Sequence, residues 1–239
     1  MMIAGSGSLP GGDYQEDIKI SGSGTVNGNV SCTEFAISGS GKVDGNLVCS
    51  GKASISGSGS VQGNVTAKER FTISGSGSVK GEIKSEKLVV SGSLSCDSVS
   101  VEDLTVSGSM KSQGNVSAEN AAVHGDIYCG GLINAEKLEV EFESGSGADS
   151  IGGSYIKIRR KGVVSGMFRR LIGKKTEGMF KVNGSIEGDV VDLEYVIAES
   201  VVGREVKIGP GCIIGSVSYS EKFTGDPSAE VRKAEQDGM

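Results

Sequence analysis

A short glycine–serine motif returns along this chain at nearly constant spacing, and this periodicity constrains the fold more than any other feature. Copies of SGSG, or of its first three residues, begin at Ser21, Ser38, Ser56, Ser74, Ser91 and Ser107, and a degenerate copy begins at His124. The spacings are 16 to 18 residues. A flexible Gly/Ser linker has no physical reason to keep such a register. The motif therefore marks a structural repeat of about 17 residues.

Apolar residues occupy fixed positions between the motifs and alternate with polar residues, as they do in a β-strand. The last position of each repeat holds Ile37, Ile55, Ile73, Val90, Val106, Val123 and Val140. Glycine at the motif permits tight corners. One turn cannot bury its own apolar residues, whereas stacked turns bury them against one another. The pattern predicts an all-β protein, a parallel β-helix or solenoid with rungs of about 17 residues and about seven regular rungs.

The repeat also predicts how the chain is divided. We expect a flexible N-terminal tail at 1–17, a regular β-solenoid at 18–143, a loop with a basic amphipathic insertion at 144–181, a second solenoid block at 182–220 and a polar C-terminal tail at 221–239. Residues 144–154 break the register and are expected to form a loop, with one more strand around Ile156. The sequence leaves open whether the second block extends the first solenoid or packs against it.

Positive charge is concentrated in one segment of an otherwise acidic chain. The net charge is −6, yet residues 157–175 contain eight Lys or Arg and no acid. Apolar residues from Val163 to Ile172 recur there at near-helical spacing, so a short helix or loop with a cationic flank is expected. It would either contact an anionic membrane surface or pack along the solenoid with its charges in water. The candidates for a membrane or anionic-partner contact are Arg159, Arg160, Lys161, Phe168, Arg169, Arg170, Leu171, Lys174 and Lys175.

The residue types that carry chemistry are sparse or already explained by the repeat. Cys32 and Cys49 share a repeat position with Ala67, so we interpret them as small core residues and not as metal ligands. His124 is the one histidine and replaces a motif serine. The chain has no P-loop and few aromatic residues, so no catalytic site, cofactor, metal or nucleic-acid partner is expected.

Two further observations concern the cellular compartment and the leading enzymatic alternative. Free cysteines without an export signal or a long apolar run predict a reducing cytoplasm. The stretch IGPGCIIGSV resembles two hexapeptide turns of a left-handed β-helix acyltransferase, but this block lacks the histidine on which those enzymes generally rely. A hexapeptide-repeat acyltransferase-like enzyme therefore remains an alternative, and a non-enzymatic protein is the expectation.

The tandem (V/I)SGSGxVxGN(V/L) repeats, followed by IGPGCxI, resemble the bactofilin family of polymer-forming cytoskeletal proteins, in particular its longer Gram-positive-type members. The resemblance covers roughly residues 18–220. It implies a right-handed β-helix that joins end to end into nucleotide-independent filaments. It also implies a cytoplasmic scaffold, often at the inner face of the cytoplasmic membrane, that serves cell shape, motility or the positioning of client proteins.

The ends of a solenoid support self-assembly independently of that resemblance. Terminal rungs expose unpaired backbone donors and acceptors, and monomeric solenoids cover them with polar caps. We find no convincing cap before Ile18 or after Val217. The predicted polymer-end residues are Ile18, Ile20, Val217, Tyr219 and Phe223. The chain itself is thus the expected partner, and a monomeric solenoid adaptor for another protein is the second alternative.

Overall fold

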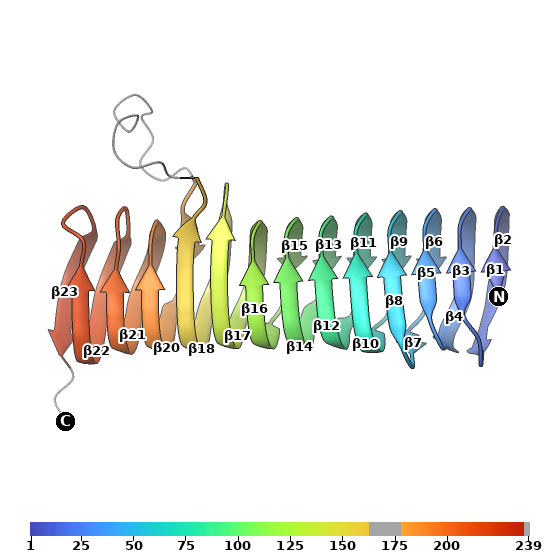
Figure 1. The fold of residues 1–239 in the computed structure, drawn as a ribbon, viewed down its shortest axis with the longest axis horizontal. Coiled ribbons are helices and arrows are strands. Elements are labelled where there is room, and N and C mark those ends of the chain that lie inside the picture. Colours follow the sequence, from blue (N-terminus) through green and yellow to red (C-terminus); the bar gives the residue numbers. More distant parts are fainter. Residues whose placement is uncertain (163–177, 237–239) are drawn as a thin grey trace.

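The chain winds into one long parallel β-solenoid, with its strands side by side in a row and its two termini at opposite ends (Figure 1). The computed structural model describes residues 1–162 and 178–236. Over these residues the chain makes about thirteen turns. At a spacing of about 4.8 Å between neighbouring strands, they form a rod roughly 60 Å long. The all-β solenoid predicted from the repeat is confirmed.

Most turns carry three extended segments separated by corners, and neighbouring segments merge into longer strands in several turns. The first turns contain β1 (Met2–Ile3), β2 (Ser6–Asp13), β3 (Ile18–Ile20), β4 (Ser23–Cys32), β5 (Phe35–Ile37), β6 (Ser40–Val43), β7 (Leu47–Cys49), β8 (Lys52–Ile55) and β9 (Ser58–Val61). The middle turns contain β10 (Val65–Ile73), β11 (Ser76–Val79), β12 (Glu82–Val90), β13 (Ser93–Cys96), β14 (Ser98–Val106), β15 (Ser109–Ser112) and β16 (Val116–Val123). The last turns contain β17 (Asp126–Phe142), β18 (Ser146–Arg160), β19 (Phe180–Val182), β20 (Ser185–Leu193), β21 (Val196–Ile208), β22 (Ile213–Gly225) and β23 (Glu230–Gln236).

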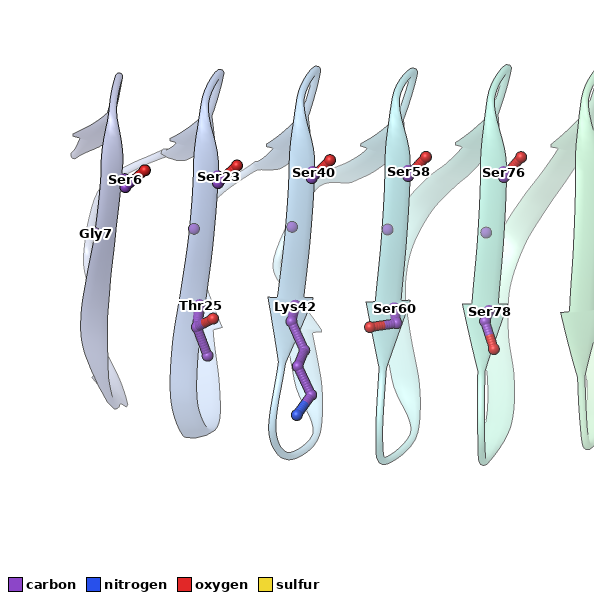
Figure 2. A pocket seen from close by; sticks show the side chains of 14 residues that line it. Ser6, Gly7, Ser23, Thr25, Ser40, Lys42, Ser58, Ser60, Ser76 and Ser78 are labelled. Carbon is purple, nitrogen blue, oxygen red and sulfur yellow. The ribbon is translucent and has the colours of Figure 1, made fainter.

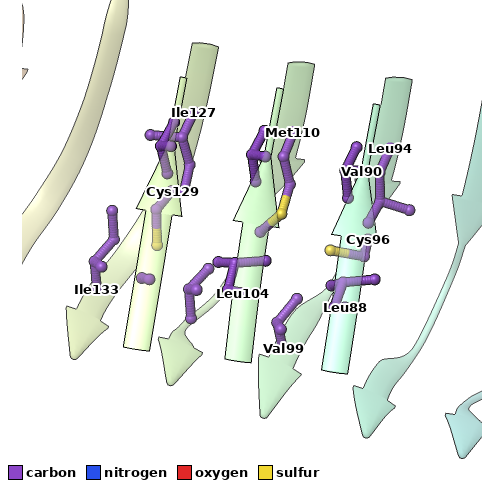
Figure 3. Close-up of a cluster of buried hydrophobic side chains, with 14 of the residues drawn as sticks. Leu88, Val90, Leu94, Cys96, Val99, Leu104, Met110, Ile127, Cys129 and Ile133 are labelled. Atoms are coloured by element: carbon purple, nitrogen blue, oxygen red, sulfur yellow. The ribbon is translucent and has the colours of Figure 1, made fainter. Parts of the chain in front are cut away.

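The repeat positions stack in register from turn to turn, which places like residues on top of one another inside the rod. Ile37 pairs with Ile20 on one side and with Ile55 on the other. The residues that close each repeat, from Ile37 to Val140, are all buried as predicted. Figure 3 shows such a cluster, in which side chains from neighbouring turns point into a shared interior. Each turn therefore completes the core of the next.

The glycines of the motif are required by close approach of neighbouring turns. A Cβ built on Gly75 would lie 2.0 Å from the carbonyl oxygen of Gly57 in the preceding turn, which no real side chain tolerates. A Cβ on Gly77 would come within 3.0 Å of the Ile73 side chain. Tight corners are therefore set by backbone packed directly on backbone.

Asparagines complete the hydrogen bonding at another corner. The side-chain oxygens of Asn29 and Asn46 each accept a hydrogen bond of 2.8 Å from a backbone N–H one turn later, that of Asn46 and that of Asn64. Asn64 accepts in the same way from Glu82, at 2.9 Å. These corner amides would otherwise lack a strand partner. The ladder thus holds successive turns in register where the strands are interrupted.

The structure differs from the sequence expectation at the N-terminus, where a flexible tail was predicted. Residues 1–17 form the first turn, in which β1 pairs with β3 and β2 pairs with β4. Leu9 lies over Val26 and is buried. The physical reason is a degenerate motif, AGSG at Ala4–Gly7, which lies 17 residues before the copy at Ser21.

Two further segments that were expected to be irregular are strands. Residues 144–154 were predicted to form a loop, but β18 begins at Ser146 and its Ile151 is buried between neighbouring turns. The predicted C-terminal tail at 221–239 contains the end of β22 and all of β23, where Val231 pairs with Ile214. Backbone pairing with an existing turn orders both segments although their side-chain alternation is weak.

The second block extends the first solenoid. β18 pairs in parallel with β17 on one side and with β20 on the other, so that Ile151 lies between Ile133 and Ile186. The stack is therefore continuous across the position of the basic insertion. The short helix or loop expected after Arg160 falls on residues 163–177, outside the described residues. Where the structure is described, no helix is long and apolar enough to cross a membrane.

Candidate assembly ends and the base of the basic segment

The N-terminal end of the rod presents the open edge of its first turn. Within the described residues, β1 and β2 have hydrogen-bonded neighbours on one side only. The Met1 amine binds the Glu16 carboxylate at 2.7 Å, which fixes the start of β1. Tyr14 donates from its hydroxyl to the Pro10 carbonyl at 2.8 Å and closes the end of β2. This end is thus a preformed turn with an unpaired edge.

The C-terminal end presents a second open edge. β23 pairs only with β22 over the described residues, and the last residues of β22, from Lys222 to Gly225, extend beyond that pairing. Tyr219 and Phe223 stack with their ring centroids 5.5 Å apart, and both are half-buried against the core. Val231 also packs on the core. The apolar interior therefore continues to the last turn.

Four of the five predicted polymer-end residues lie one turn inside these edges, and Phe223 lies at the open edge itself. Ile18 and Ile20 belong to β3, which is enclosed between β1 and β5, and both are buried. Val217 is likewise buried in β22, with β21 and β23 on its two sides. Tyr219 is covered by Gln236 of β23, whereas Phe223 lies beyond it. The sequence reasoning missed the outermost turns because their motifs are degenerate.

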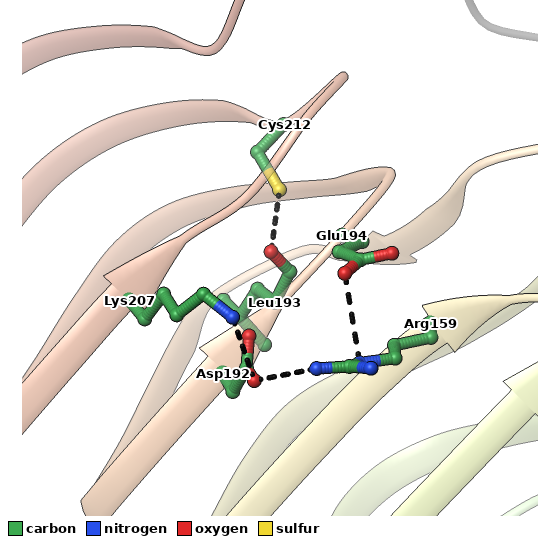
Figure 4. A network of polar contacts seen from close by, with 6 residues as sticks. All are labelled: Arg159, Asp192, Leu193, Glu194, Lys207 and Cys212. Carbon is green, nitrogen blue, oxygen red and sulfur yellow. Dashed lines mark hydrogen bonds and ion pairs between the residues drawn. The ribbon is translucent and has the colours of Figure 1, made fainter. Parts of the chain in front are cut away.

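Three of the predicted cationic contact residues lie at the base of the basic segment, where Arg159 joins two turns (Figure 4). Its guanidinium donates to Asp192 at 2.8 Å and lies 3.6 Å from a carboxylate oxygen of Glu194. Lys207 approaches the same Asp192 oxygen at 3.2 Å. Burial alone would lower the pKa of Arg159, but the hydrogen bond and negative charge of Asp192 raise it. Arg159 is therefore held as a cation within the protein.

The two neighbouring cations are also engaged by the chain itself. The Arg160 guanidinium lies 5.8 Å from the ring centroid of Tyr195, which is within cation–π range. Lys161 donates to Glu143 at 2.7 Å, and this hydrogen bond raises the pKa of the lysine. The remaining predicted contact residues are Phe168, Arg169, Arg170, Leu171, Lys174 and Lys175, and they lie outside the described residues.

A shallow trough of about 640 Å³ runs across the first five turns. Figure 2 shows its column of Ser6, Ser23, Ser40, Ser58 and Ser76. The glycine after each serine faces inward, where a Cβ on Gly41 would lie 2.7 Å from the Ile37 side chain, so outward-facing side chains of the neighbouring positions border the trough. Among the described residues, no group of three or more His, Cys, Asp or Glu is arranged to hold a metal ion.

The protein is by its fold a β-solenoid of the repeat type, with an unpaired strand edge at each end of its described part. Comparison with known proteins then gives the family. The family described as "Bactofilin: Polymer-forming cytoskeletal" matches residues 3–70 and 41–136, which together exceed half of the chain. The chain belongs to the bactofilin family, a structural cytoskeletal family, and the resemblance seen in its repeats is confirmed.

Two Bacillus subtilis (strain 168) proteins are similar over part of their length. The "Uncharacterized protein YhbF" is 35% identical over 104 residues, which cover 43% of this chain and 40% of that protein. The "Uncharacterized protein YhbE" is 36% identical over 103 residues, covering 42% and 41%. The chain thus spans about two fifths of the curated relatives that it matches. No solved structure matches the chain significantly.

Proposed function

We propose that this protein is a self-polymerising cytoskeletal scaffold that forms filaments by end-to-end stacking of its β-solenoid. The observation that carries the proposal is the open strand edge at each end, at β1 and β2 and at β22 and β23. A turn from a second molecule would offer these edges the same parallel hydrogen bonds that join turns inside the rod. Assembly therefore needs no nucleotide, because both end turns are already folded.

The size of an end contact is sufficient for such an assembly. Inside the rod, β10 pairs with β12 at seven positions in one turn. Backbone hydrogen bonds contribute about 1 kcal/mol each, and burial of an apolar layer adds about 25 cal/mol per Å². Association costs roughly 4–15 kcal/mol in lost freedom of movement. One full turn of contact is therefore of the order required for reversible, concentration-dependent polymerisation.

A pair of matched variants tests the proposal. Val231→Lys places a charge at the inner side of the last turn and should abolish pelleting of filaments in ultracentrifugation, while circular dichroism remains β-rich. Thr66→Lys makes the same kind of change at an exposed position in the middle of the rod and should leave pelleting intact. A wild-type protein that stays monomeric across salt and protein concentration would contradict polymerisation and favour the adaptor alternative. A discrete trimer that binds an acyl donor would favour the acyltransferase alternative.

We further propose that the scaffold is cytoplasmic and contacts the inner face of the membrane through its basic segment, in support of cell shape, motility or client positioning. The support is sequence composition: residues 163–177 combine apolar residues with four cations. Arg159, Arg160 and Lys161 have partners in the chain, so we now assign the contact to Arg169, Arg170, Lys174 and Lys175.

Vesicle binding tests this second proposal separately. Changing those four cations to Gln should reduce co-pelleting with phosphatidylserine-containing vesicles several-fold, because each basic residue near an anionic surface contributes about 1 kcal/mol. The control changes four exposed solenoid cations to Gln, namely Lys68, Arg70, Lys80 and Lys84. Equal binding by wild type and the 169/170/174/175 variant would exclude the basic segment as the membrane contact.

A further inference from the structure

Two cysteines meet inside the rod, in its second and third turns. Cys32 ends β4 and Cys49 ends β7, and the two residues are directly paired in the parallel ladder. Their side chains both face the core, and the two Sγ atoms lie 3.7 Å apart. Both are free thiols. The repeat does not require cysteine at this position, since Ala67 occupies it in the next turn. The contact places two redox-active groups side by side.

This arrangement lies within the geometric range for a covalent bond. Directly paired residues of neighbouring parallel strands have Cα atoms about 4.8 Å apart, and disulfides span Cα separations of about 4.4–6.8 Å. The sulfur atoms need to approach by about 1.7 Å to reach bonding distance. Side-chain rotation can supply most of this movement, because Ala67 in the next turn leaves space beside Cys49.

We propose that Cys32 and Cys49 are a modification site, at which a peroxide oxidises the pair to a reversible disulfide that joins the second and third turns. The other three cysteines have no such neighbour. Ser112 separates Cys96 from Cys129 in their ladder, so those two lie two turns apart. Cys212 instead contacts the Leu193 carbonyl oxygen at 3.4 Å. The proposal does not depend on polymerisation.

The two sulfurs have different roles in the reaction. Cys32 is 5% exposed and Cys49 only 1%, so a small oxidant reaches Cys32 first. The hydrogen bond from the Cys49 thiol lowers the pKa of Cys32, and the same bond raises the pKa of Cys49. This hydrogen bond and the greater exposure both favour the Cys32 sulfur as the one that reacts first, because a thiolate is the reactive form of cysteine.

Oxidation of the pair needs no reactant other than the two thiols and hydrogen peroxide. The Cys32 thiolate attacks one oxygen of hydrogen peroxide, the O–O bond breaks, and the departing hydroxide takes up a proton as water. The Cys49 sulfur attacks the resulting sulfenic acid at Cys32. The S–S bond forms, the S–O bond breaks, and hydroxide leaves with the Cys49 proton as a second water. Two thiols lose two electrons in total, and the peroxide is reduced to two molecules of water.

The bond would tie the chain across 17 residues near the N-terminal end of the rod. A disulfide stabilises mainly by restricting the unfolded chain. The oxidised protein should therefore melt several degrees higher than the reduced protein, and a thiol reductant should reverse the shift. The second and third turns would then resist local opening, to which turns near an open end are most prone.

Peptide mass mapping tests the proposal directly on the full chain. The folded protein is treated with hydrogen peroxide, then denatured, and its remaining thiols are alkylated before tryptic digestion. Residues 20–42 and 43–52 are separate tryptic peptides that contain one cysteine each. We expect these two peptides to be joined, with a mass lower than their sum by two hydrogen atoms. Three of the five cysteines should be alkylated, and reductant should restore five.

Single substitutions provide the controls. Cys32→Ala and Cys49→Ala should each keep all four remaining thiols, and Ala67 in the same ladder indicates that alanine fits this position. Cys96→Ala should still lose two thiols. Recovery of five alkylated thiols from the oxidised wild type would overturn the proposal. So would a cross-link that involves Cys96, Cys129 or Cys212, or stable oxygenation of Cys32 with Cys49 still alkylated.

Discussion

The regular turns from β3 to β16 and the later turns from β18 to β23 share one solenoid but differ in how their charged side chains are shielded. In the regular turns, ion pairs lie within one strand, as Lys84–Glu82 does, or join neighbouring turns, as Lys87–Asp103 does, and each of these side chains is at least 35% exposed. In the later turns, charged side chains connect different turns, as Arg159 does with Asp192 and Arg204 does with Glu221. The Asp192 side chain is only 17% exposed, so this charged contact of the later turns is better shielded from water than those pairs of the regular turns.

One of the later turns is also shorter, and this changes its corner. Val65 and Ile83 are paired residues 18 positions apart, whereas Ile186 and Val201 are 15 apart. With fewer residues to turn in, Tyr195 takes a positive φ of 58°, which is uncommon for a residue with a side chain. Close backbone contacts thus occur in both regions, since a Cβ on Gly153 in β18 would lie 1.9 Å from the Ala135 carbonyl oxygen. The later turns add a shielded charged contact and a corner with a positive φ.

The largest expected effect breaks the steric fit of a regular turn. Gly75→Ala puts a methyl group 2.0 Å from a backbone oxygen, where no flexible side chain can move away. We expect a loss of about 3 kcal/mol in the free energy of unfolding, measured by chemical denaturation. Gly152→Ala in β18 is the matched control, since its nearest neighbour is the Asn134 side chain at 3.3 Å. Equal stability of the two variants would contradict backbone contact as the determinant of the corner.

A smaller effect is expected at the charged contact of the later turns. Asp192 accepts from Arg159 and Lys207, and its side chain is only 17% exposed. Asp192→Asn should lower the free energy of unfolding by about 2 kcal/mol, because it leaves a partly buried arginine with one carboxylate fewer. Asp44→Asn in the regular turns removes the exposed Lys42–Asp44 pair and should change stability by less than about 0.5 kcal/mol. Thermal melts of both variants check the difference, and a larger loss for Asp44→Asn would refute it.

A third effect is absent at neutral pH and arises only at alkaline pH. Burial raises the pKa of Cys96, in the regular turns, to about 12 and that of Cys212, in the later turns, to about 11. The unfolded thiol ionises near the ordinary value of 9.0. A raised folded pKa means that this stability is present below pH 9 and is lost as pH rises toward 11 or 12, at up to about 1.4 kcal/mol per pH unit for each thiol. Cys96→Ala and Cys212→Ala should each reduce the slope of stability against pH between 9 and 10.5. An unchanged slope in both variants would show that these thiols do not contribute.

Much of the fold could be predicted because the core residues recur at fixed positions of the sequence repeat. Apolar–polar alternation within each repeat gives the strand period, and the spacing of SGSG and of residues such as Ile37, Ile55 and Ile73 gives the length of a turn. The first turn was missed because Ala4 replaces the motif serine, and the first half of β18 was missed because Gly-rich residues 144–154 carry little side-chain alternation. In both segments the order comes from backbone pairing with a neighbouring turn, which side-chain patterns do not reveal.

The candidate sites were less predictable for a related reason. Arg159 and Asp192 are 33 residues apart, on either side of the basic segment, so their contact follows from the continuous stacking of β18 and β20. Cys32 and Cys49 were correctly assigned to one inward-facing column, but only the register shows that their sulfurs touch. A contact between turns can be predicted only when the number of residues in each turn is known. Between β18 and β20 the basic insertion obscures that number.

The central claim is that rods of this protein join end to end in line with the solenoid axis, and fibre diffraction of aligned filaments tests it most directly. The account predicts a strong reflection near 4.8 Å along the filament axis, because every strand lies across that axis. It also predicts an axial subunit repeat of about 60 Å, the length of about thirteen stacked turns. A 4.8 Å reflection at right angles to the filament axis would instead mean that rods associate side by side, and it would contradict assembly through the open ends.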